Sequence, residues 1–190
     1  MYTLFIDTHD KNVLIILYKD SHILVKENII SPNRHSEITM PTIEKVVTEN
    51  KIDVKDLESI IVVNGPGSFT GVRLAVTIAK TMSYALNIPI RVIDSLIIKA
   101  LMIDADNKIV ALEDRNGAYI GIFDKNNKFI KPYKYLNKND YLIFKSDNDI
   151  VVDVGIDYEK VYQYAMSLKP INPHAVKPLY IKGISALNGK

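Results

Sequence analysis

The chain has 190 residues, 47% of them hydrophobic, with a net charge of +2 and no cysteine. This length is enough for one large domain or two small ones that fold without a metal or a disulfide. The missing cysteine excludes thiolate catalysis, a disulfide framework and a cysteine zinc site, and the small net charge does not indicate nucleic-acid binding by the whole surface. The N-terminus has no basic targeting region and no apolar run is long enough to span a bilayer, so we expect a cytoplasmic protein.

The first part of the chain predicts three strands and a helix. Apolar runs at 4–6, 13–18 and 23–30 are separated by short polar segments, which is typical of an antiparallel meander. Apolar residues at helical spacing then predict a helix over 35–50, in which Pro41 marks a first turn or a kink.

The stretch 59–86 predicts a strand, a glycine turn and a helix. Residues 60–63 are Ile-Ile-Val-Val, and Asn-Gly-Pro-Gly-Ser-Phe-Thr-Gly follows at 64–71, a pattern that favours a strand buried on both faces. The glycines permit close approach of a ligand or of another backbone segment, and a helix start attracts anions. The spacing matches neither a P-loop nor a dinucleotide motif, so a purely structural turn is the alternative that spacing alone favours.

The helix expected over 71–86 carries small residues at every fourth position, namely Ala75, Ala79 and Ser83. They predict a groove in which another helix can approach closely. Leu74 and Ile78 widen the apolar surface beyond a single stripe, so we expect this helix to pack against more than its own sheet. A helix that is simply central in the fold is the alternative.

The remaining pattern predicts a second, shorter set of elements. In chain order, we expect a strand at 90–93, a helix at 95–103, strands at 108–112, 119–123, 128–135, 141–144 and 150–154, and a helix at 158–168. Three prolines after residue 168 predict an irregular, packed C-terminal segment.

A meander followed by alternating helices and strands is the order of a ribonuclease-H-like domain, the unit duplicated in the actin, sugar-kinase and Hsp70 (ASKHA) class. Placing Asp7 over Glu113 without a gap puts Leu14 on Ile120, a weak internal repeat. We therefore predict an α/β, duplicated ribonuclease-H-like fold with an abbreviated second domain. The expected domains are 1–105 and 106–190, with the last residues able to return to the first.

Such a fold invites three enzyme hypotheses. An ATP-dependent enzyme would use acids after equivalent strands to hold magnesium and phosphates. The candidate nucleotide or anion ligands are Asp7, Thr8, Gly65, Gly67, Ser68 and Glu113. The first turn has no glycine that would let a phosphate approach, which argues against this hypothesis. An autonomous ATP-dependent enzyme is therefore kept only as the alternative function.

The other two hypotheses are rejected. A nuclease needs clustered carboxylates, but Asn64 stands where the fourth strand should end in an acid. A metalloprotease needs a motif such as His-Glu-x-x-His, whereas His35 is followed four residues later by Thr39, and a single histidine does not chelate. We predict no catalytic residue and no metal site.

The string Gly-Pro-Gly-Ser-Phe-Thr-Gly-Val-Arg, from Gly65 to Arg73, closely resembles the signature of the TsaB (YeaZ) family. Weaker matches follow in order: Leu4-Phe5-Ile6-Asp7-Thr8, Arg34-His35-Ser36-Glu37 with Pro41, Asn87-Ile88-Pro89-Ile90, Glu113-Asp114-Arg115-Asn116-Gly117 and Lys177-Pro178-Leu179-Tyr180-Ile181-Lys182. The chain departs from the family at His9, which replaces a common serine, at Glu113, which replaces aspartate, and in its shorter C-terminal domain.

The resemblance implies a non-catalytic scaffold in bacterial synthesis of N6-threonylcarbamoyladenosine at position 37 of tRNAs that read ANN codons. Family members pair with the catalytic TsaD subunit through two N-terminal helices, and they self-associate as homodimers through the same helices. A TsaE-like ATPase joins the complex. The chain would need no cofactor of its own, since ATP or ADP and metal are expected on the TsaD partner, and it would meet tRNA indirectly, through the complex.

The resemblance and the helical patterns together predict one partner-binding surface. Its expected residues are His35, Ile38, Thr42, Val46, Val72, Arg73, Ala75, Val76, Ala79, Met82 and Ser83. A binding module with no role in tRNA modification is the remaining alternative.

Overall fold

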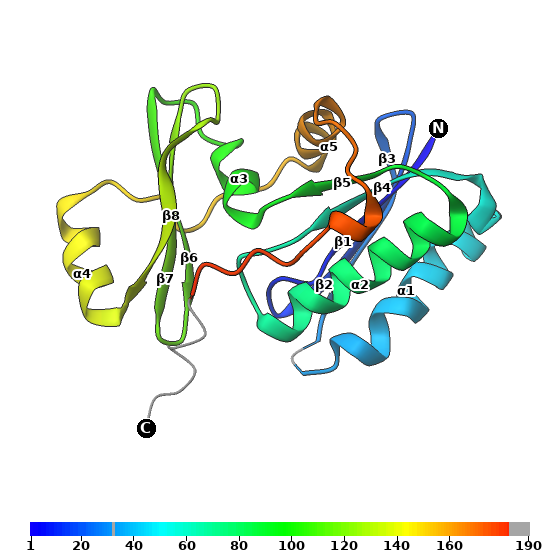
Figure 1. The fold of residues 1–190 in the computed structure, drawn as a ribbon, viewed down its shortest axis with the longest axis horizontal. Helices are drawn as coiled ribbons and strands as arrows, with labels where there is room; N and C mark the ends of the chain where they lie inside the picture. The colour runs from blue at the N-terminus through cyan, green and yellow to red at the C-terminus, as the bar shows by residue number, and fades with distance from the viewer. Residues whose placement is uncertain (32, 183–190) are drawn as a thin grey trace. The chain divides into compact units, whose positions relative to one another are not determined.

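The computed structural model describes residues 1–31 and 33–182, so residues 183–190 of the expected second domain lie outside the described part. The chain divides into two compact units (Figure 1). The first unit is formed by Met1–Ile93 together with Tyr158–Pro178, and the second by Asp94–Asp157 with the chain from Leu179 onward. Residues 94–105, which the sequence places with the first domain, thus group with the second unit.

The first unit contains a five-stranded mixed sheet. Its strands are β1 (Tyr2–Asp7), β2 (Asn12–Lys19), β3 (His22–Ile30), β4 (Leu57–Val63) and β5 (Ile90–Ile93), in the order β3-β2-β1-β4-β5. Strands β1, β2 and β3 form the predicted antiparallel meander, and β4 and β5 join it in parallel. This is the topology of a ribonuclease-H-like domain.

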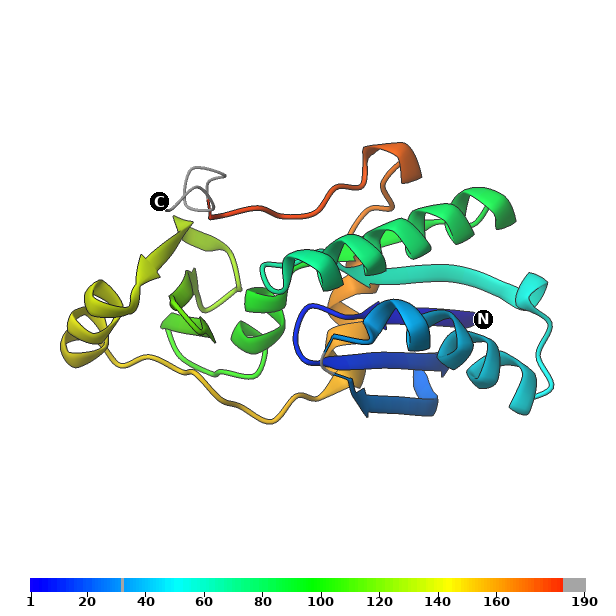
Figure 2. The same cartoon turned by 90° about the horizontal axis from the view of Figure 1, so that it is seen from below.

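Helices cover both faces of this sheet. Helices α1 (His35–Glu49) and α2 (Phe69–Leu86) run side by side over one face (Figure 2), and α5 (Tyr158–Ser167) lies on the other. On the α5 side the rings of Phe5 and Tyr158 meet at 5.9 Å. Because both faces of β4 are covered, its residues do not alternate, as predicted for a strand buried on both faces.

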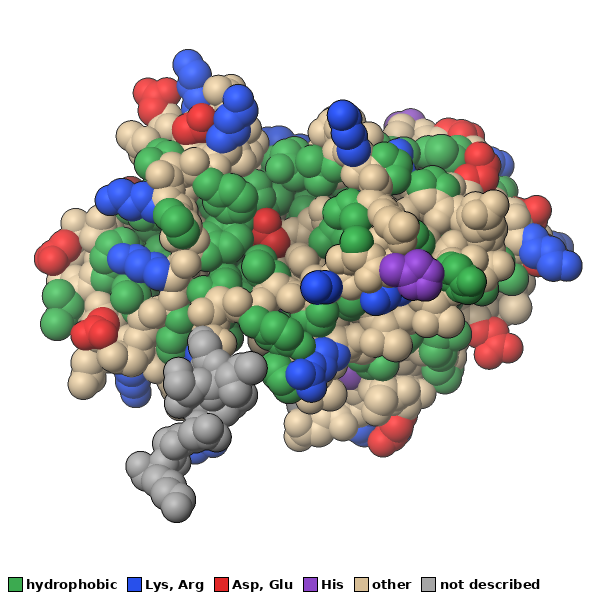
Figure 3. All heavy atoms as spheres, in the orientation of Figure 1, with side chains coloured by type: hydrophobic (Ala, Val, Ile, Leu, Met, Phe, Trp, Pro, Cys, Tyr) green, Lys and Arg blue, Asp and Glu red, His purple; other side chains and the backbone are tan. Residues whose placement is uncertain are grey.

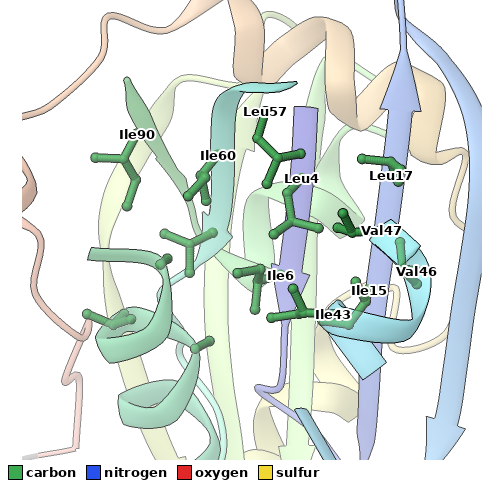
Figure 4. Close-up of a cluster of buried hydrophobic side chains, with 14 of the residues drawn as sticks. Leu4, Ile6, Ile15, Leu17, Ile43, Val46, Val47, Leu57, Ile60 and Ile90 are labelled. Atoms are coloured by element: carbon green, nitrogen blue, oxygen red, sulfur yellow. The ribbon is translucent and has the colours of Figure 1, made fainter. Parts of the chain in front are cut away.

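The main core lies between the sheet and helices α1 and α2 (Figure 4). Alternate residues of β1 and β2 point into it, among them Leu4, Ile6, Ile15 and Leu17. Helix α1 adds Ile43, Val46 and Val47, and a short 3-10 turn, η1 (Val54–Asp56), then leads into β4. Pro41 lies inside α1 rather than ending it.

The C-terminal segment returns to the first unit and is packed, as predicted. Ile171 bridges Ile90 on β5, and the turn η2 (Pro173–Ala175) contacts α2. Val176 is buried in the main core. The side-chain amide of Asn64 donates to the carbonyl oxygen of Lys177 at 3.1 Å, which ties the segment to the end of β4.

The second unit is smaller and repeats only the meander. Strands β6 (Asn107–Asp114), β7 (Gly117–Asp124) and β8 (Phe129–Asn137) form an antiparallel sheet, with helices α3 (Ser95–Ala100) and α4 (Lys138–Asp147). Ala111, Ala118, Ile120 and Tyr141 form its core. The second domain is therefore abbreviated, as the sequence predicts.

Two predicted strands of this unit are wrong. Residues 141–144 lie inside α4, because the side chain of Asn137 caps a helix there by accepting from the Asp140 N–H at 3.0 Å. Residues 150–154 make only an isolated bridge, between Val151 and Val110.

Candidate functional site

The glycine loop of 64–71 folds onto the chain's own β1–β2 turn. A Cβ atom at Gly67 would collide with the carbonyl oxygen of His9, and one at Gly71 with the carbonyl oxygen of Thr8. The two segments are also hydrogen bonded, since the Ser68 N–H donates to the His9 oxygen at 2.7 Å and the Thr8 hydroxyl donates to the Gly71 oxygen at 2.6 Å. Both glycines are therefore explained by close packing of backbone on backbone.

Two of the backbone donors that an anion could use at this loop are engaged by the protein itself. The Ser68 N–H is bound to His9, and the Gly71 N–H donates to the Ser68 hydroxyl oxygen at 3.3 Å, which caps α2. The Gly65 backbone has a φ of 104°, which favours glycine. The structure thus brings Thr8, Gly67 and Ser68 together, and hydrogen bonds between the loop and the turn hold the two segments in place.

The two candidate acids are each engaged within their own unit. Asp7 is 6% exposed, and its Oδ1 lies 2.6 Å from Nδ1 of His9 and accepts the His9 N–H at 3.0 Å. Glu113, in the second unit, accepts from the Tyr141 hydroxyl at 2.7 Å and from the Lys145 ammonium at 3.1 Å. The hydrogen bond from Tyr141, followed by that from Lys145, lowers the pKa of Glu113.

His35 starts α1 and is held by local contacts. Its Nε2 lies 2.7 Å from the carbonyl oxygen of Asp10, and its own carbonyl oxygen accepts from the Thr39 hydroxyl at 2.6 Å. Over residues 1–31 and 33–182, no group of three or more His, Cys, Asp or Glu side chains is placed to hold a metal ion. No helix in the same ranges has the length and apolar character needed to cross a membrane.

The small-residue stripe of α2 faces the chain's own sheet, which corrects the prediction of an open groove. Ala75 and Ala79 are fully buried, and Ser83 is 1% exposed and donates to the Ile88 oxygen at 2.6 Å. The small residues do recur at the predicted four-residue spacing. This spacing shows only that a neighbouring element packs closely on that face of the helix, and here the neighbour is the sheet. Four further predicted partner residues are also at most 4% exposed: Thr42, Val46, Val72 and Val76.

A different face of the two helices is accessible. His35, Ile38 and Met82 are half-buried and Arg73 is exposed, so these four predicted residues can meet a partner. Leu74 and Ile78, which the sequence identified only as a widening of the apolar surface, are also half-buried and lie at four-residue spacing with Met82. We call Ile38, Leu74, Ile78 and Met82 the α1–α2 stripe.

Two further exposed side chains, which the sequence did not single out, lie on the same two helices. Met40 on α1 is 47% exposed, and Phe69 at the start of α2 is 44% exposed. The Arg73 guanidinium stacks on the Phe69 ring at 3.6 Å, which orders both side chains at the helix start. Exposure of such residues depends on how the helix rotates on its sheet, which periodicity alone does not specify.

Comparisons with known proteins place the chain among relatives of one pathway. The family model described as "TsaD: tRNA N6-adenosine threonylcarbamoyltransferase" matches residues 26–118. A Bacillus subtilis protein named tRNA threonylcarbamoyladenosine biosynthesis protein TsaB is 35% identical over 96 residues, which is 50% of this chain and 42% of that protein. A protein of the same name from Buchnera aphidicola (subsp. Schizaphis graminum) is 38% identical over 51% of this chain and 46% of its own length. YeaZ from Pseudomonas aeruginosa shares the fold, with a TM-score of 0.77 and 16% identity over 94% of this chain and 99% of that one.

These matches support the TsaB (YeaZ) family for this chain. The matches with the curated TsaB relatives extend over about half of those relatives' length. An uncharacterized protein of Mycoplasma genitalium is 26% identical along 95% of both chains. The family's glycine-loop string is the one that packs on the β1–β2 turn here.

Proposed function

We propose that this chain is a non-catalytic, activating subunit in the synthesis of N6-threonylcarbamoyladenosine at position 37 of tRNAs that read ANN codons. In this proposal it pairs with a TsaD-like catalytic subunit, and a TsaE-like ATPase joins the complex. The observation that carries the proposal is the similarity to proteins named for threonylcarbamoyladenosine biosynthesis. The name of these relatives gives a pathway but not a role within it. We base the scaffold role on the hydrogen bonds and the exposed surfaces of this chain.

Two features of the chain support a scaffold rather than an enzyme. Two glycine-loop donors and both candidate acids are hydrogen bonded within their own unit, so these groups expected to hold a nucleotide already serve the fold. By contrast, the α1–α2 stripe keeps apolar side chains partly in contact with water, and such surfaces favour association with another protein. We propose that the stripe, flanked by His35 and Arg73, is where a TsaD-like subunit or a second copy of the chain binds.

The test is co-purification with the TsaD-like protein of the same cell, followed by an assay of threonylcarbamoyladenosine formation with and without this chain. We expect a stable complex whose activity depends on the chain. The variant Met40→Glu places a charge on α1 at an apolar residue that is 47% exposed, and should weaken the complex with little effect on folding. Leu142→Glu on α4, at 56% exposed, is the matched control and should leave the complex intact.

Two results would count against the proposal. If the TsaD-like protein works equally well alone, the chain is not an activating subunit. If Met40→Glu and Leu142→Glu weaken the complex equally, the binding surface lies elsewhere. Sedimentation of the chain alone, with and without Met40→Glu, tests in the same way whether a homodimer uses the stripe.

A further inference from the structure

The segment from Lys125 to Lys138 is strongly basic. It contains Lys125, Lys128, Lys131, Lys134 and Lys138, and no Asp or Glu. The whole chain has a net charge of only +2, so the rest of the chain is net negative. We call 125–138 the basic β8 segment, because it runs from the β7–β8 turn along β8 to the first residue of α4.

All five lysines of the basic β8 segment are exposed. Within the described ranges, none of them forms an ion pair with an acid, whereas Lys45, Lys145 and Lys182 elsewhere do pair with carboxylates. The Lys134 ammonium lies 4.0 Å from the centre of the Phe144 ring. This contact is with a ring and not with a carboxylate, so the charge of Lys134 is not neutralised by it. Positive charge that is kept exposed and unpaired in this way is available to an anionic ligand.

Strand β8 carries Lys131 and Lys134, and the other three lysines lie just before or just after it. Among the residues that the structure describes, strand β8 is an edge strand that pairs only with β7. Lys131 and Lys134 stand opposite Ile122 and Ile120 of β7, so both lie on the α4 side of the sheet. At about 3.3 Å per residue, the nine residues of β8 extend roughly 30 Å. Figure 3 shows Lys and Arg side chains (blue) among hydrophobic ones (green) over this sheet.

The residues on the β8 edge limit the class of ligand that can bind there. Edge lysines and Pro132, which has no N–H to donate, both oppose pairing with another strand. A polyanion with regularly spaced charges fits these ammonium groups better than a strand does. Phe129, which is 55% exposed at the start of β8, adds an aromatic face on which a base can stack.

We propose that the basic β8 segment binds the phosphate backbone of RNA, and specifically of the tRNA on which the proposed complex acts. The choice of RNA over an anionic membrane rests on the proposed function. This contact would be direct, in addition to any that tRNA makes with a TsaD-like subunit. It would position the tRNA through charge, without reading its sequence.

The test measures binding of the full chain alone to a fluorescently labelled, unmodified tRNA transcript by anisotropy at several KCl concentrations. The variant K128Q/K131Q/K134Q removes three charges from the segment. The control K11Q/K55Q/K169Q removes three exposed charges from the first unit. Each lost phosphate contact should make the plot of log K against log salt less steep by about 0.7 to 0.9.

We expect the β8 variant to reduce the slope by about 2 to 3 and to weaken binding at 50 mM KCl on the order of tenfold or more. The control should change neither quantity. Thermal melting checks that both variants fold, and K125Q/K138Q, at the two ends of the segment, gives a second measurement with an expected slope change of about 1.5.

Several outcomes would overturn the proposal. Equal losses in the β8 variant and the control would mean that only net charge matters, and no binding by the unaltered chain at 50 mM KCl would exclude an RNA site. Binding to phosphatidylserine vesicles but not to tRNA would make a membrane the occupant. Association of K128Q/K131Q/K134Q with the TsaD-like protein should stay normal, so a failure of the scaffold proposal and a failure of this one are separate results.

Discussion

The substitution Gly71→Ala tests whether the glycine loop serves the fold or a ligand. Gly71 lies in the first turn of α2, and a Cβ there would collide with the carbonyl oxygen of Thr8. Two hydrogen bonds join the loop to the turn at this point, from the Thr8 hydroxyl to the Gly71 oxygen and from the Ser68 N–H to the His9 oxygen. Moving the backbones apart weakens both.

The expected magnitude combines opposing effects. Alanine favours the helix over glycine by up to about 1 kcal/mol. Overpacking costs about 1–3 kcal/mol, and each weakened hydrogen bond about 0.5–1.5 kcal/mol. We therefore expect a net destabilisation of about 2–3 kcal/mol, which lowers the melting temperature by roughly 4–12 °C for a chain of this size.

The assay is thermal melting of the isolated chain, followed by circular dichroism. Thr77→Ala is the matched control, because Thr77 is exposed on the same helix and gains propensity without a collision. We expect Gly71→Ala to lower the melting temperature and Thr77→Ala to raise it slightly. If Gly71→Ala leaves the melting temperature unchanged or raises it, the close packing does not account for this glycine, and a ligand becomes the better explanation.

Three further predictions follow from burial and charge. Ala79→Glu should destabilise the chain by more than about 3 kcal/mol in melting experiments, because it buries an unpaired carboxylate; an unchanged melting temperature would contradict this. Burial raises the pKa of Asp94 from 3.8 to about 6, so its ionisation weakens the folded state as pH rises from about 4 to 6. Asp94→Asn should therefore stabilise the chain by about 1–2 kcal/mol at pH 7.5 but not at pH 4. This value is smaller than the free energy that the full pKa shift corresponds to, because the residue keeps some exposed surface. ATP with Mg²⁺ should raise the melting temperature of the isolated chain by less than about 1 °C, and a rise of several degrees would favour the autonomous ATP-dependent enzyme.

Much of the fold could be predicted because its strongest elements are locally determined. Four β-branched residues at 60–63 can only be a buried strand or a very short helix, and the flanking glycines favour the strand. The run at 141–144 carries no such bias. It became part of α4 because Asn137 and Asp140 form a cap just before it, a signal that is present in the sequence but was outweighed by the short apolar run.

The candidate site was harder to predict than the fold. Whether one of its residues is exposed depends on which other elements pack over it. Ala79 and Ile78 are neighbours on one helix, yet the first is fully buried and the second half-buried. Spacing identifies the faces of a helix but not which face meets the sheet. Similarly, the sequence placed Asp7 and His9 in one turn, while their 2.6 Å contact depends on how that turn folds back.

In the proposed function, the same residues that suggest an enzyme serve the fold instead. In a nucleotide-binding version of the fold, the acid after the first strand and the glycine loop must stay free for metal and phosphate. Here Asp7 is engaged by His9, and two loop donors, the Ser68 and Gly71 N–H groups, are engaged by the turn and the helix cap. These bonds stiffen the end of the sheet from which α2 starts. A rigid α2 holds the α1–α2 stripe in one conformation, which lowers the entropic cost of binding a partner.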